Sequence, residues 1–396
     1  MASDYSYLEL YYEKNLCLWH KWILQEERNC DAIERQLHIL AKQMNIEKRE
    51  SKKNKTRIIH YALVDYHPDI IAMRSYLSDT QNYIVDSEID TDKMTTDFLL
   101  MMALRDRHAK KAGYESYASM ILSLEGIEIN ALKQGLNDRL NHEIERAKEL
   151  IKKYDLKLDN WYTGLRSIEC GAKVNHIMLM DRVLNYFPEV YGNVKIERHT
   201  CNKAGFASEV RPNEIHINIE RVDTLFDMNV FFHEMGHGIA HAYDNSKGLD
   251  RIYSNFYEEL TGVLTERYLG QILRDTHGKC LDEIRVLQYA RFAIEALYEL
   301  ELWFSDTSPE DLFRAHYQRI IESDEEMSIG LRQALRLSEP LYMYNYILAD
   351  MAAEKIIADG PSQLKDLASY LVEEVFSHGG NKNWIEFALS TAKEFD

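Results

Sequence analysis

The scarcity of proline constrains the fold of this chain more than any other feature of its sequence. Only six of the 396 residues are proline, so long intervals lack the strongest helix breaker. Within these intervals apolar residues recur at helical spacing. From Ile127 to Tyr154, for example, Leu132, Leu136 and Leu140 share one face and charged residues occupy the other. The sequence therefore predicts a mostly α-helical protein.

One stretch departs from this helical pattern. Between Gly192 and Glu220, the segments Val194–Glu197 and Ile215–Ile219 alternate with a period of two, and Gly205 and Pro212 lie between them. Period-two alternation near turn residues is typical of β-strands. We expect a small antiparallel sheet here, directly before the segment "FFHEMGHGIAHAY".

The charge and hydropathy of the chain exclude several classes of partner. There are 65 acidic and 47 basic side chains, which gives a formal net charge of −18. Nucleic acids and anionic membranes need a basic surface, so we expect neither as a partner. No apolar run approaches the ~20 residues of a membrane span, and the first residues do not resemble a signal peptide. The sequence is typical of a soluble, cytoplasmic protein.

The cysteines support the same location. Five are present, at wide spacing and without a C-x-x-C pair: Cys17, Cys30, Cys170, Cys201 and Cys280. An odd number of scattered cysteines is typical of free thiols in a reducing compartment.

The segment "FFHEMGHGIAHAY" carries the pattern H-E-x-x-H. Asp223 and Thr224 offer an N-cap, so we expect a helix that stacks His233 and His237 on one face. Two imidazoles at this spacing can hold one zinc ion, and Glu234 is placed to act as a general base on a water.

The rest of the segment is less specific. Gly236 removes a side chain between the two histidines, so that another backbone or a substrate could approach closely. His241 continues the spacing of four, but a lone histidine on a helix is more often a hydrogen-bonded core residue than a ligand.

A catalytic zinc ion has three protein ligands, and the stretch "SNFYEELTGVLTERYL" offers the third. Glu259 and Glu266 are seven residues apart and share a helix face, whereas Glu258 points about a quarter-turn aside. One face thus provides a ligand and a carboxylate partner for a ligating histidine. Glu258, Glu259 and Glu266 all remain candidates from spacing alone.

These two segments together resemble the zinc signature of the thimet oligopeptidase and oligoendopeptidase F family. The resemblance implies one zinc ion per chain, with His233 and His237 as ligands and Glu234 as the general base. The resemblance favours Glu259 as the third ligand, because Glu266 follows it at the family's spacing of seven residues. Glu258 remains the alternative third ligand. The angiotensin-converting-enzyme group has the same motif sequence, "HEMGH". Four residues after its ligand Glu, however, that group has an Asp where this chain has Val263, so the oligopeptidase family is the better match.

Further segments extend the resemblance over about residues 100 to 350. "LRDRHAKKAGYESYASM" is similar to an upstream segment of the family, and "PLYMYNYILAD" is similar to its downstream tyrosine cluster. A tyrosine of this cluster is implied to stabilise the oxyanion. Tyr342 and Tyr346 can share one helix face, whereas Tyr344 points elsewhere. "EIHINI", with His216, falls where the family places the edge strand that pairs with a peptide substrate.

The resemblance implies a large helical, zincin-like metallopeptidase with a cleft between helical lobes. Residues 1–100 would form a shortened N-terminal lobe and residues 101–396 the catalytic region. The implied function is zinc-dependent hydrolysis of short peptides by an oligopeptidase or endopeptidase. The alternative is a catalytically weak or inactive relative that binds a peptide or a protein in the same cleft. The intact Glu234 favours the enzyme, because a binding module needs no general base.

Overall fold

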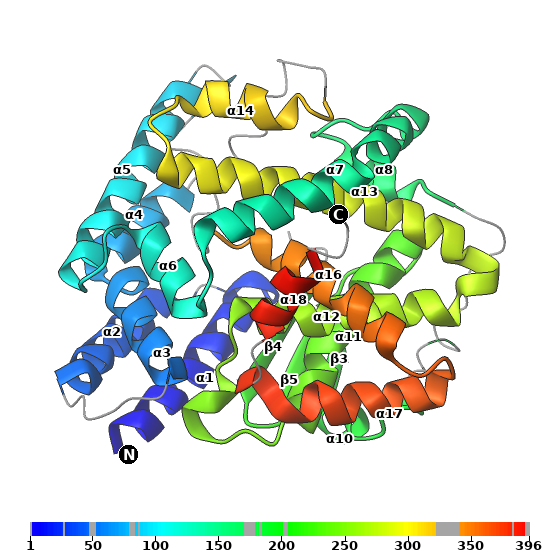
Figure 1. Ribbon diagram of the computed structural model, residues 1–396. Helices are drawn as coiled ribbons and strands as arrows, with labels where there is room; N and C mark the ends of the chain where they lie inside the picture. Colours follow the sequence, from blue (N-terminus) through cyan, green and yellow to red (C-terminus); the bar gives the residue numbers. More distant parts are fainter. Residues whose placement is uncertain are drawn as a thin grey trace.

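A computed structural model describes residues 2–26, 28–46, 53–78, 84–85, 88–169, 179, 181, 184–200, 205–321, 340–381 and 384–392. Helices dominate the fold, and a small sheet lies among them (Figure 1). The prediction of a mostly α-helical protein with a small sheet before the histidine helix is confirmed.

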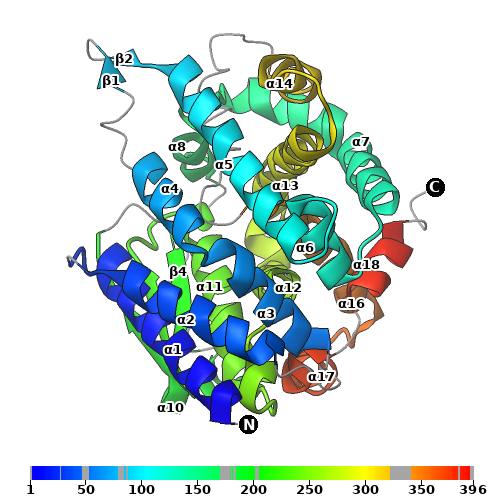
Figure 2. The same cartoon turned by 90° about the vertical axis from the view of Figure 1, so that its left-hand side faces the viewer.

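The first part of the chain forms a layer of helices beside the remainder of the molecule (Figure 2). Its elements are α1 (Ala2–Trp22), α2 (Cys30–Ile46), α3 (Lys53–Asp65), α4 (Pro68–Ser78), the short strands β1 (Ile84–Val85) and β2 (Glu88–Ile89), α5 (Thr91–Lys111) and α6 (Tyr117–Glu125). Apolar residues of α1, α2 and α3 share a cluster with Leu249 and Ile252, so this layer packs directly against the later part of the chain.

The sheet has three strands in the order β3-β5-β4. They are β3 (Val194–Glu197), β4 (Gly205–Arg211) and β5 (Glu214–Ile219). The two predicted segments, which correspond to β3 and β5, are therefore parallel neighbours. The expectation of an antiparallel sheet is wrong for this pair, and of the three strands only β4 and β5 form an antiparallel pair. The reason is the unpredicted β4, which forms a hairpin with β5 through Asn213 and occupies one edge of β5. As a result β3 pairs with the other edge.

The main core surrounds a set of long helices. They are α7 (Ile129–Tyr154), α11 (Leu225–Tyr243), α12 (Asn255–Ile272), α13 (Arg274–Phe304) and α16 (Tyr344–Asp359). Shorter elements cover them: α8 (Trp161–Arg166), α10 (Val190–Asn193), η2 (Gly248–Arg251), α14 (Pro309–Tyr317), α17 (Leu364–Glu374), η4 (Phe376–Asn381) and α18 (Trp384–Ala392). One continuous apolar cluster joins α11, α12, α13 and α16, so the histidine helix lies inside the core.

A buried carboxylate fixes α16 to three other helices. Asp350 is fully buried and accepts a hydrogen bond from Arg139 of α7 at 2.6 Å. It also pairs with Arg267 of α12, and Arg285 of α13 lies 3.6 Å away. Since an unpaired buried charge is costly, this cluster specifies how the four helices meet.

The cysteine prediction is wrong where the structure describes it. Cys17 and Cys30 form a disulfide, because α1 and α2 pack together and bring their Cα atoms to 5.8 Å. Cys280 is disulfide-bonded as well. Cys170 and Cys201 lie outside the described residues. Disulfides are typical of proteins in oxidising compartments, so these bonds argue against the predicted cytoplasmic location. That location stays a prediction.

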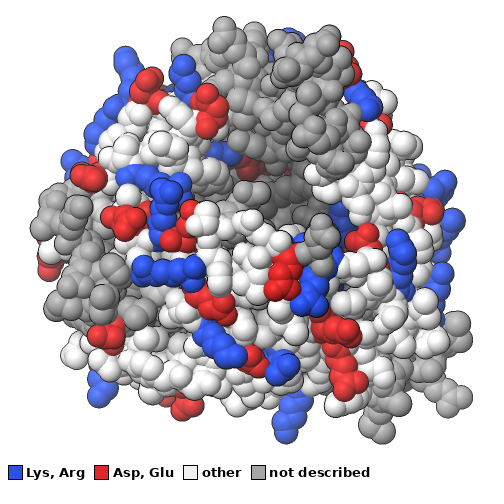
Figure 3. All heavy atoms as spheres, turned by 180° about the vertical axis from the view of Figure 1, so that it is seen from behind, with Lys and Arg blue, Asp and Glu red and all other residues white. Residues whose placement is uncertain are grey.

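Two further expectations concern the chain as a whole. The boundary predicted at residue 100 falls within α5, and the division into two domains stays a prediction. No helix in the described ranges is both long and apolar enough to span a bilayer. On the face shown in Figure 3, which is hollowed near its centre, described Lys and Arg side chains alternate with Asp and Glu.

Candidate metal centre

The local sequence fixes the start of α11. The Thr224 side chain accepts from the backbone N–H of Asp227, and the Asp227 carboxylate accepts from that of Thr224. This reciprocal capping box satisfies two backbone donors at the helix N-terminus. From this start, His233 and His237 fall on one face, and their ring centroids lie 4.8 Å apart.

Two glycines allow α12 to cross α11 at close range. A Cβ at Gly236 would collide with the backbone oxygen of Thr261, and a Cβ at Gly262 would lie 2.5 Å from Cε1 of His233. The expectation that Gly236 permits a close backbone approach is confirmed, and that backbone belongs to α12. The His233 ring therefore lies directly on the α12 backbone.

This crossing brings together three groups that could hold a metal ion. One ligand atom from each of His233, His237 and Glu259 lies within 4.8 Å of the others. Nε2 of His233 is 3.1 Å from Oε2 of Glu259. That oxygen is buried and has no hydrogen-bond partner in the described part of the chain, as expected of an oxygen that coordinates a cation. Two imidazoles and one carboxylate are also the donors that zinc prefers, so the residues fit the ion.

Glu258 lies to one side of this group. Its carboxylate is 3.7 Å from Nδ1 of His237 and 3.6 Å from Nε2 of His241. The geometry therefore favours Glu259 over Glu258 as the third ligand.

Hydrogen bonds orient both imidazoles. Nδ1 of His233 is 2.6 Å from Oε1 of Glu266, whose other oxygen accepts from Asn229 at 2.9 Å. Nδ1 of His237 is 3.2 Å from the hydroxyl oxygen of Thr261. Because the Thr261 hydroxyl donates to the backbone oxygen of Glu258, it accepts from the imidazole. Both rings are thus held with Nε2 available to a cation.

The electrostatics of the group favour a cation. Burial lowers the pKa of His237 to about 4, helped by the neighbouring His233, so the imidazole is neutral and its lone pair is available. Burial also acts to lower the pKa of His233, but Glu259 and Glu266 outweigh it and raise that pKa well above the ordinary value. The carboxylates of Glu259 and Glu266 thus stabilise positive charge at His233, and a bound divalent cation can supply that charge.

Glu234 lies between α11 and the sheet. It follows His233 on the helix, and a Cβ at Gly205 would lie 2.8 Å from its Cγ and Oε1. The Glu234 carboxylate therefore packs against the first residue of β4, the strand at one edge of the sheet. Only a glycine leaves room for it there.

Tyr342 and Tyr346 meet near Glu259, although Tyr342 lies before the start of α16 and not on one helix face with Tyr346 as expected. The Tyr342 hydroxyl donates to Oε1 of Glu259, and the Tyr342 and Tyr346 rings meet with centroids 5.7 Å apart. Tyr346 also contacts the His233 ring, at 5.8 Å between centroids. Tyr344 points away from this group and lines a cavity described below.

Two further predicted histidines have other surroundings. His241 lies between Glu209 and Glu258, and its ring stacks on Tyr253 at 4.6 Å between centroids. His216 lies between Glu197 and Glu214, with its ring against Trp19. The expectation that "EIHINI" is an edge strand is wrong, because β5 pairs with β3 on one side and β4 on the other.

A cavity of about 150 Å³ lies between the N-terminal helices and the helices of the metal centre. It has a strongly aromatic lining with three charged residues, Lys14, Arg57 and Glu125, of which Arg57 and Glu125 lie 4.0 Å apart. Its tyrosines are Tyr7, Tyr11, Tyr61, Tyr66, Tyr253 and Tyr344.

Sequence reasoning indicated Glu266 as a carboxylate partner of a ligating histidine, but it missed Asn229, Thr261 and Tyr289. Asn229 is four residues before His233 on the same helix, so its spacing was a usable signal, whereas Thr261 supports His237 from another helix and gave none. Tyr289, whose hydroxyl is 3.4 Å from Glu266, gave no such signal because it belongs to α13.

Comparison with known proteins is informative for the fold. No protein-family model matches the sequence, and no curated protein matches it either. Among solved structures, an M32 carboxypeptidase from Deinococcus radiodurans R1 is similar, with 13% identity, a TM-score of 0.64, and coverage of 99% of this chain and 96% of that one.

Two other solved structures share the fold at similarly low sequence identity. Metallocarboxypeptidase 1 of Trypanosoma cruzi has 11% identity and a TM-score of 0.64, covering 99% of this chain and 94% of that one. A protein described as an oligoendopeptidase F from Bacillus anthracis has 11% identity and a TM-score of 0.52, covering 92% and 79%. The chain therefore has the helical fold of these metallopeptidases, and its structural neighbours include both carboxypeptidases and an oligoendopeptidase.

Proposed function

We propose that this protein is a zinc-dependent peptidase that hydrolyses short peptides. The observation that carries the proposal is the group of His233, His237 and Glu259, in which a buried Glu259 oxygen lies 3.1 Å from Nε2 of His233 and makes no well-aligned hydrogen bond in the described part of the chain. A second observation, the fold shared with metallopeptidases, supports it independently.

In this proposal His233, His237 and Glu259 hold one zinc ion per chain. When bound, zinc would polarise a peptide carbonyl and lower the pKa of a water molecule. Glu266 and Thr261 hold the two imidazoles in orientation through their Nδ1 atoms.

The remaining roles fall to residues around this group. Glu234 accepts the proton of the attacking water and transfers it to the leaving amine. Tyr342 or Tyr346 donates a hydrogen bond to the oxyanion, and the contact of Tyr342 with Glu259 favours Tyr342. The backbone of a peptide substrate would lie beside β4, the strand that packs against Glu234.

The mode of cleavage has two candidates. Cleavage within the peptide follows from the resemblance to the oligopeptidase family. Release of the C-terminal residue is favoured by the carboxypeptidases, which match nearly the full length of both chains. The cationic Lys14 in the tyrosine-lined cavity would suit a terminal carboxylate, whereas Arg57 there already lies 4.0 Å from the carboxylate of Glu125. We retain endopeptidase as the first candidate and carboxypeptidase as the second.

A peptide digest tests both the activity and the mode. The zinc-loaded protein is incubated with mixed short peptides that have either free or amidated C-termini, and the fragments are identified by mass spectrometry. Internal fragments from both sets establish an endopeptidase. Loss of single residues from free C-termini alone establishes a carboxypeptidase.

The opposite result would support the binding alternative. If neither set is cleaved although the protein holds stoichiometric zinc, the proposed activity is contradicted. Peptide binding without cleavage would then indicate an inactive relative.

A further inference from the structure

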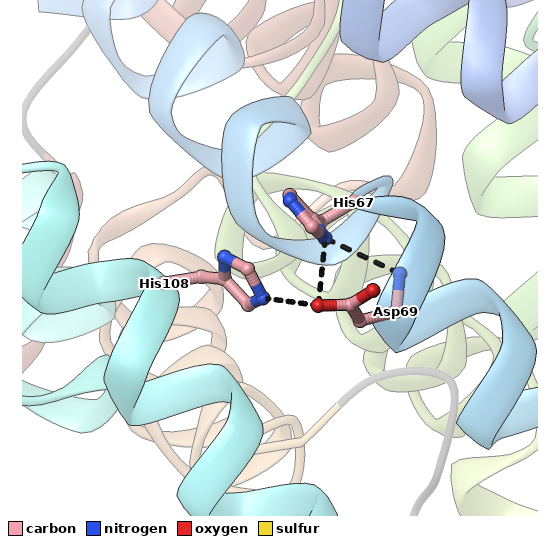
Figure 4. A group of neighbouring side chains, drawn as sticks. All are labelled: His67, Asp69 and His108. Atoms are coloured by element: carbon pink, nitrogen blue, oxygen red, sulfur yellow. Dashed lines mark hydrogen bonds and ion pairs between the residues drawn. The ribbon is translucent and has the colours of Figure 1, made fainter.

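A second cluster of candidate ligands lies in the N-terminal helices, apart from α11 and α12. His67 is in the turn between α3 and α4, Asp69 is in the first turn of α4, and His108 is in the last turn of α5. Figure 4 shows the two imidazoles and the carboxylate pointing toward one another. One ligand atom from each lies within 4.8 Å of the others.

The distances in this cluster suit a single coordination sphere. Oδ2 of Asp69 is 3.3 Å from Nε2 of His108 and 3.7 Å from Nδ1 of His67. Zinc binds nitrogen and oxygen at about 2.0–2.2 Å, so two tetrahedral ligands lie about 3.3–3.5 Å apart. Both separations from the Asp69 oxygen are therefore close to those in a zinc site, and the two histidine nitrogens lie within 4.8 Å of each other.

The protonation of the two histidines is also suitable. Their rings are tilted by 31° to each other with centroids 3.6 Å apart, so two imidazolium charges would repel. Burial and the neighbouring His108 lower the pKa of His67 to about 4, and burial and Lys111 lower that of His108. Both rings thus present neutral nitrogens, the form that binds a metal.

A third histidine borders the cluster. His38 of α2 meets His67 edge to face, with ring centroids 5.1 Å apart. Its Nδ1 lies 3.1 Å from the backbone oxygen of Ala62, so Nε2 carries the lone pair. His38 is only 3% exposed, and its Nε2 has no hydrogen-bond partner among the described residues. The cluster thus adjoins a buried nitrogen acceptor that is unsatisfied.

Some neighbouring groups oppose a cation. The backbone N–H of Asp69 donates to Nδ1 of His67 at 3.2 Å, and an ion would have to replace this bond. Arg107 lies 3.5 Å from the Asp69 carboxylate, and Lys42 and Lys111 act on the histidines from α2 and α5. These charges would repel any divalent ion, whereas the two imidazoles among the three ligands favour an ion that binds imidazole strongly over Mg²⁺ or Ca²⁺, which prefer oxygen.

We propose that His67, Asp69 and His108 form a second metal site, which binds a transition-metal cation of the zinc class and joins the start of α4 to the end of α5. Asp69 is exposed, so water can complete the coordination. An ion bound only in the folded state stabilises that state, and the site would therefore strengthen the N-terminal helices. The proposal does not depend on the proposed peptidase activity.

The metal content of the full-length chain tests this proposal. After dialysis against Zn²⁺, elemental analysis should find two ions in the wild type and one in His108→Gln. The matched control is His142→Gln, an exposed histidine of α7, which should retain two. A His108→Gln variant that holds as many ions as the wild type would overturn the proposal, whether or not the first site is filled.

A second measurement covers the case in which His108→Gln misfolds. In a His237→Gln background, which weakens the first site, Zn²⁺ should raise the Tm by binding the second site. Asp69→Asn, at a side chain that is 52% exposed, should abolish this rise and leave the Tm without metal nearly unchanged. A rise of equal size in the Asp69→Asn variant would show that the ion binds elsewhere.

Discussion

The imidazole of His233 lies directly against Gly262, where an added Cβ would be 2.5 Å from its Cε1 atom. We therefore expect Gly262→Ala to displace His233, weaken zinc binding and destabilise the fold by about 1–3 kcal/mol. Gly270→Ala is the control in the same helix, because no atom lies within 4 Å of its added Cβ. Urea unfolding and zinc titration of both variants check this, and equal zinc affinity in the two would contradict it.

Glu266 is expected to act through His233. Glu266→Gln removes the charge that accepts the Nδ1–H of His233 but keeps the side-chain shape, so zinc affinity should fall about 10–100-fold. Competition with a chromogenic chelator measures this affinity. The control is Glu145→Gln, because Glu145 is 80% exposed on α7. Unchanged affinity in Glu266→Gln would show that this hydrogen bond does not orient the ligand.

The roles of the tyrosines can be separated by kinetics. Tyr342→Phe removes the hydroxyl beside Glu259, and kcat should fall about 10²–10³-fold while zinc stays bound. Tyr344→Phe should leave kcat nearly unchanged, since Tyr344 faces the cavity. If Tyr342→Phe loses zinc instead, the hydroxyl serves to hold Glu259. If kcat is unaffected in Tyr342→Phe, another group donates the hydrogen bond to the oxyanion.

The Asp350 cluster predicts a pH dependence of stability. Burial acts to raise the Asp350 pKa, but Arg267, Arg139 and Arg285 hold it well below the ordinary value. The resulting stability is fully present above the unfolded-state pKa of about 3.9 and is lost as the pH falls toward the lower folded-state pKa. Asp350→Asn should remove this dependence and cost about 3–5 kcal/mol at neutral pH.

Urea unfolding as a function of pH provides the measurement. Asp359→Asn, at the end of the same helix, is the control because that side chain is 52% exposed. An Asp350→Asn variant as stable as this control at neutral pH would argue against the cluster as a major anchor.

The disulfide between Cys17 and Cys30 should stabilise the packing of α1 on α2. It joins residues 13 apart, and its loss should cost about 2–4 kcal/mol. Cys17→Ser, Cys30→Ser and the double variant should be equally destabilised, because each breaks the same bond. Thiol alkylation of the native protein, followed by mass spectrometry, checks the bond itself. Modification of Cys17 without prior reduction would contradict it.

The sequence was most informative where the structure depends on local periodicity. The cap at Thr224 follows from its residue type, and the shared face of His233 and His237 follows from helical spacing. The position of Tyr342 does not follow from it, because Tyr342 lies before the start of α16. The arrangement of the sheet did not follow. The pairing of β3 with β5 joins residues about twenty apart, and β4, "GFASEVR", lacks clean alternation.

Contacts between distant segments explain the other differences. The Cys17–Cys30 bond depends on how α1 packs against α2, and neither cysteine belongs to a recognisable pair motif. The cluster at His67 and Asp69 needs His108, which follows about forty residues later on α5. Contacts between such distant segments depend on tertiary packing, which the periodicity of a single sequence does not predict.

Turnover of one cleaved peptide by the wild type and by Glu234→Gln, both loaded with zinc, tests the central claim most directly. We expect Glu234→Gln to bind zinc as the wild type does but to lose at least about 10²-fold in kcat, because the general base is gone. Equal turnover by the two proteins, with equal zinc content, would contradict it.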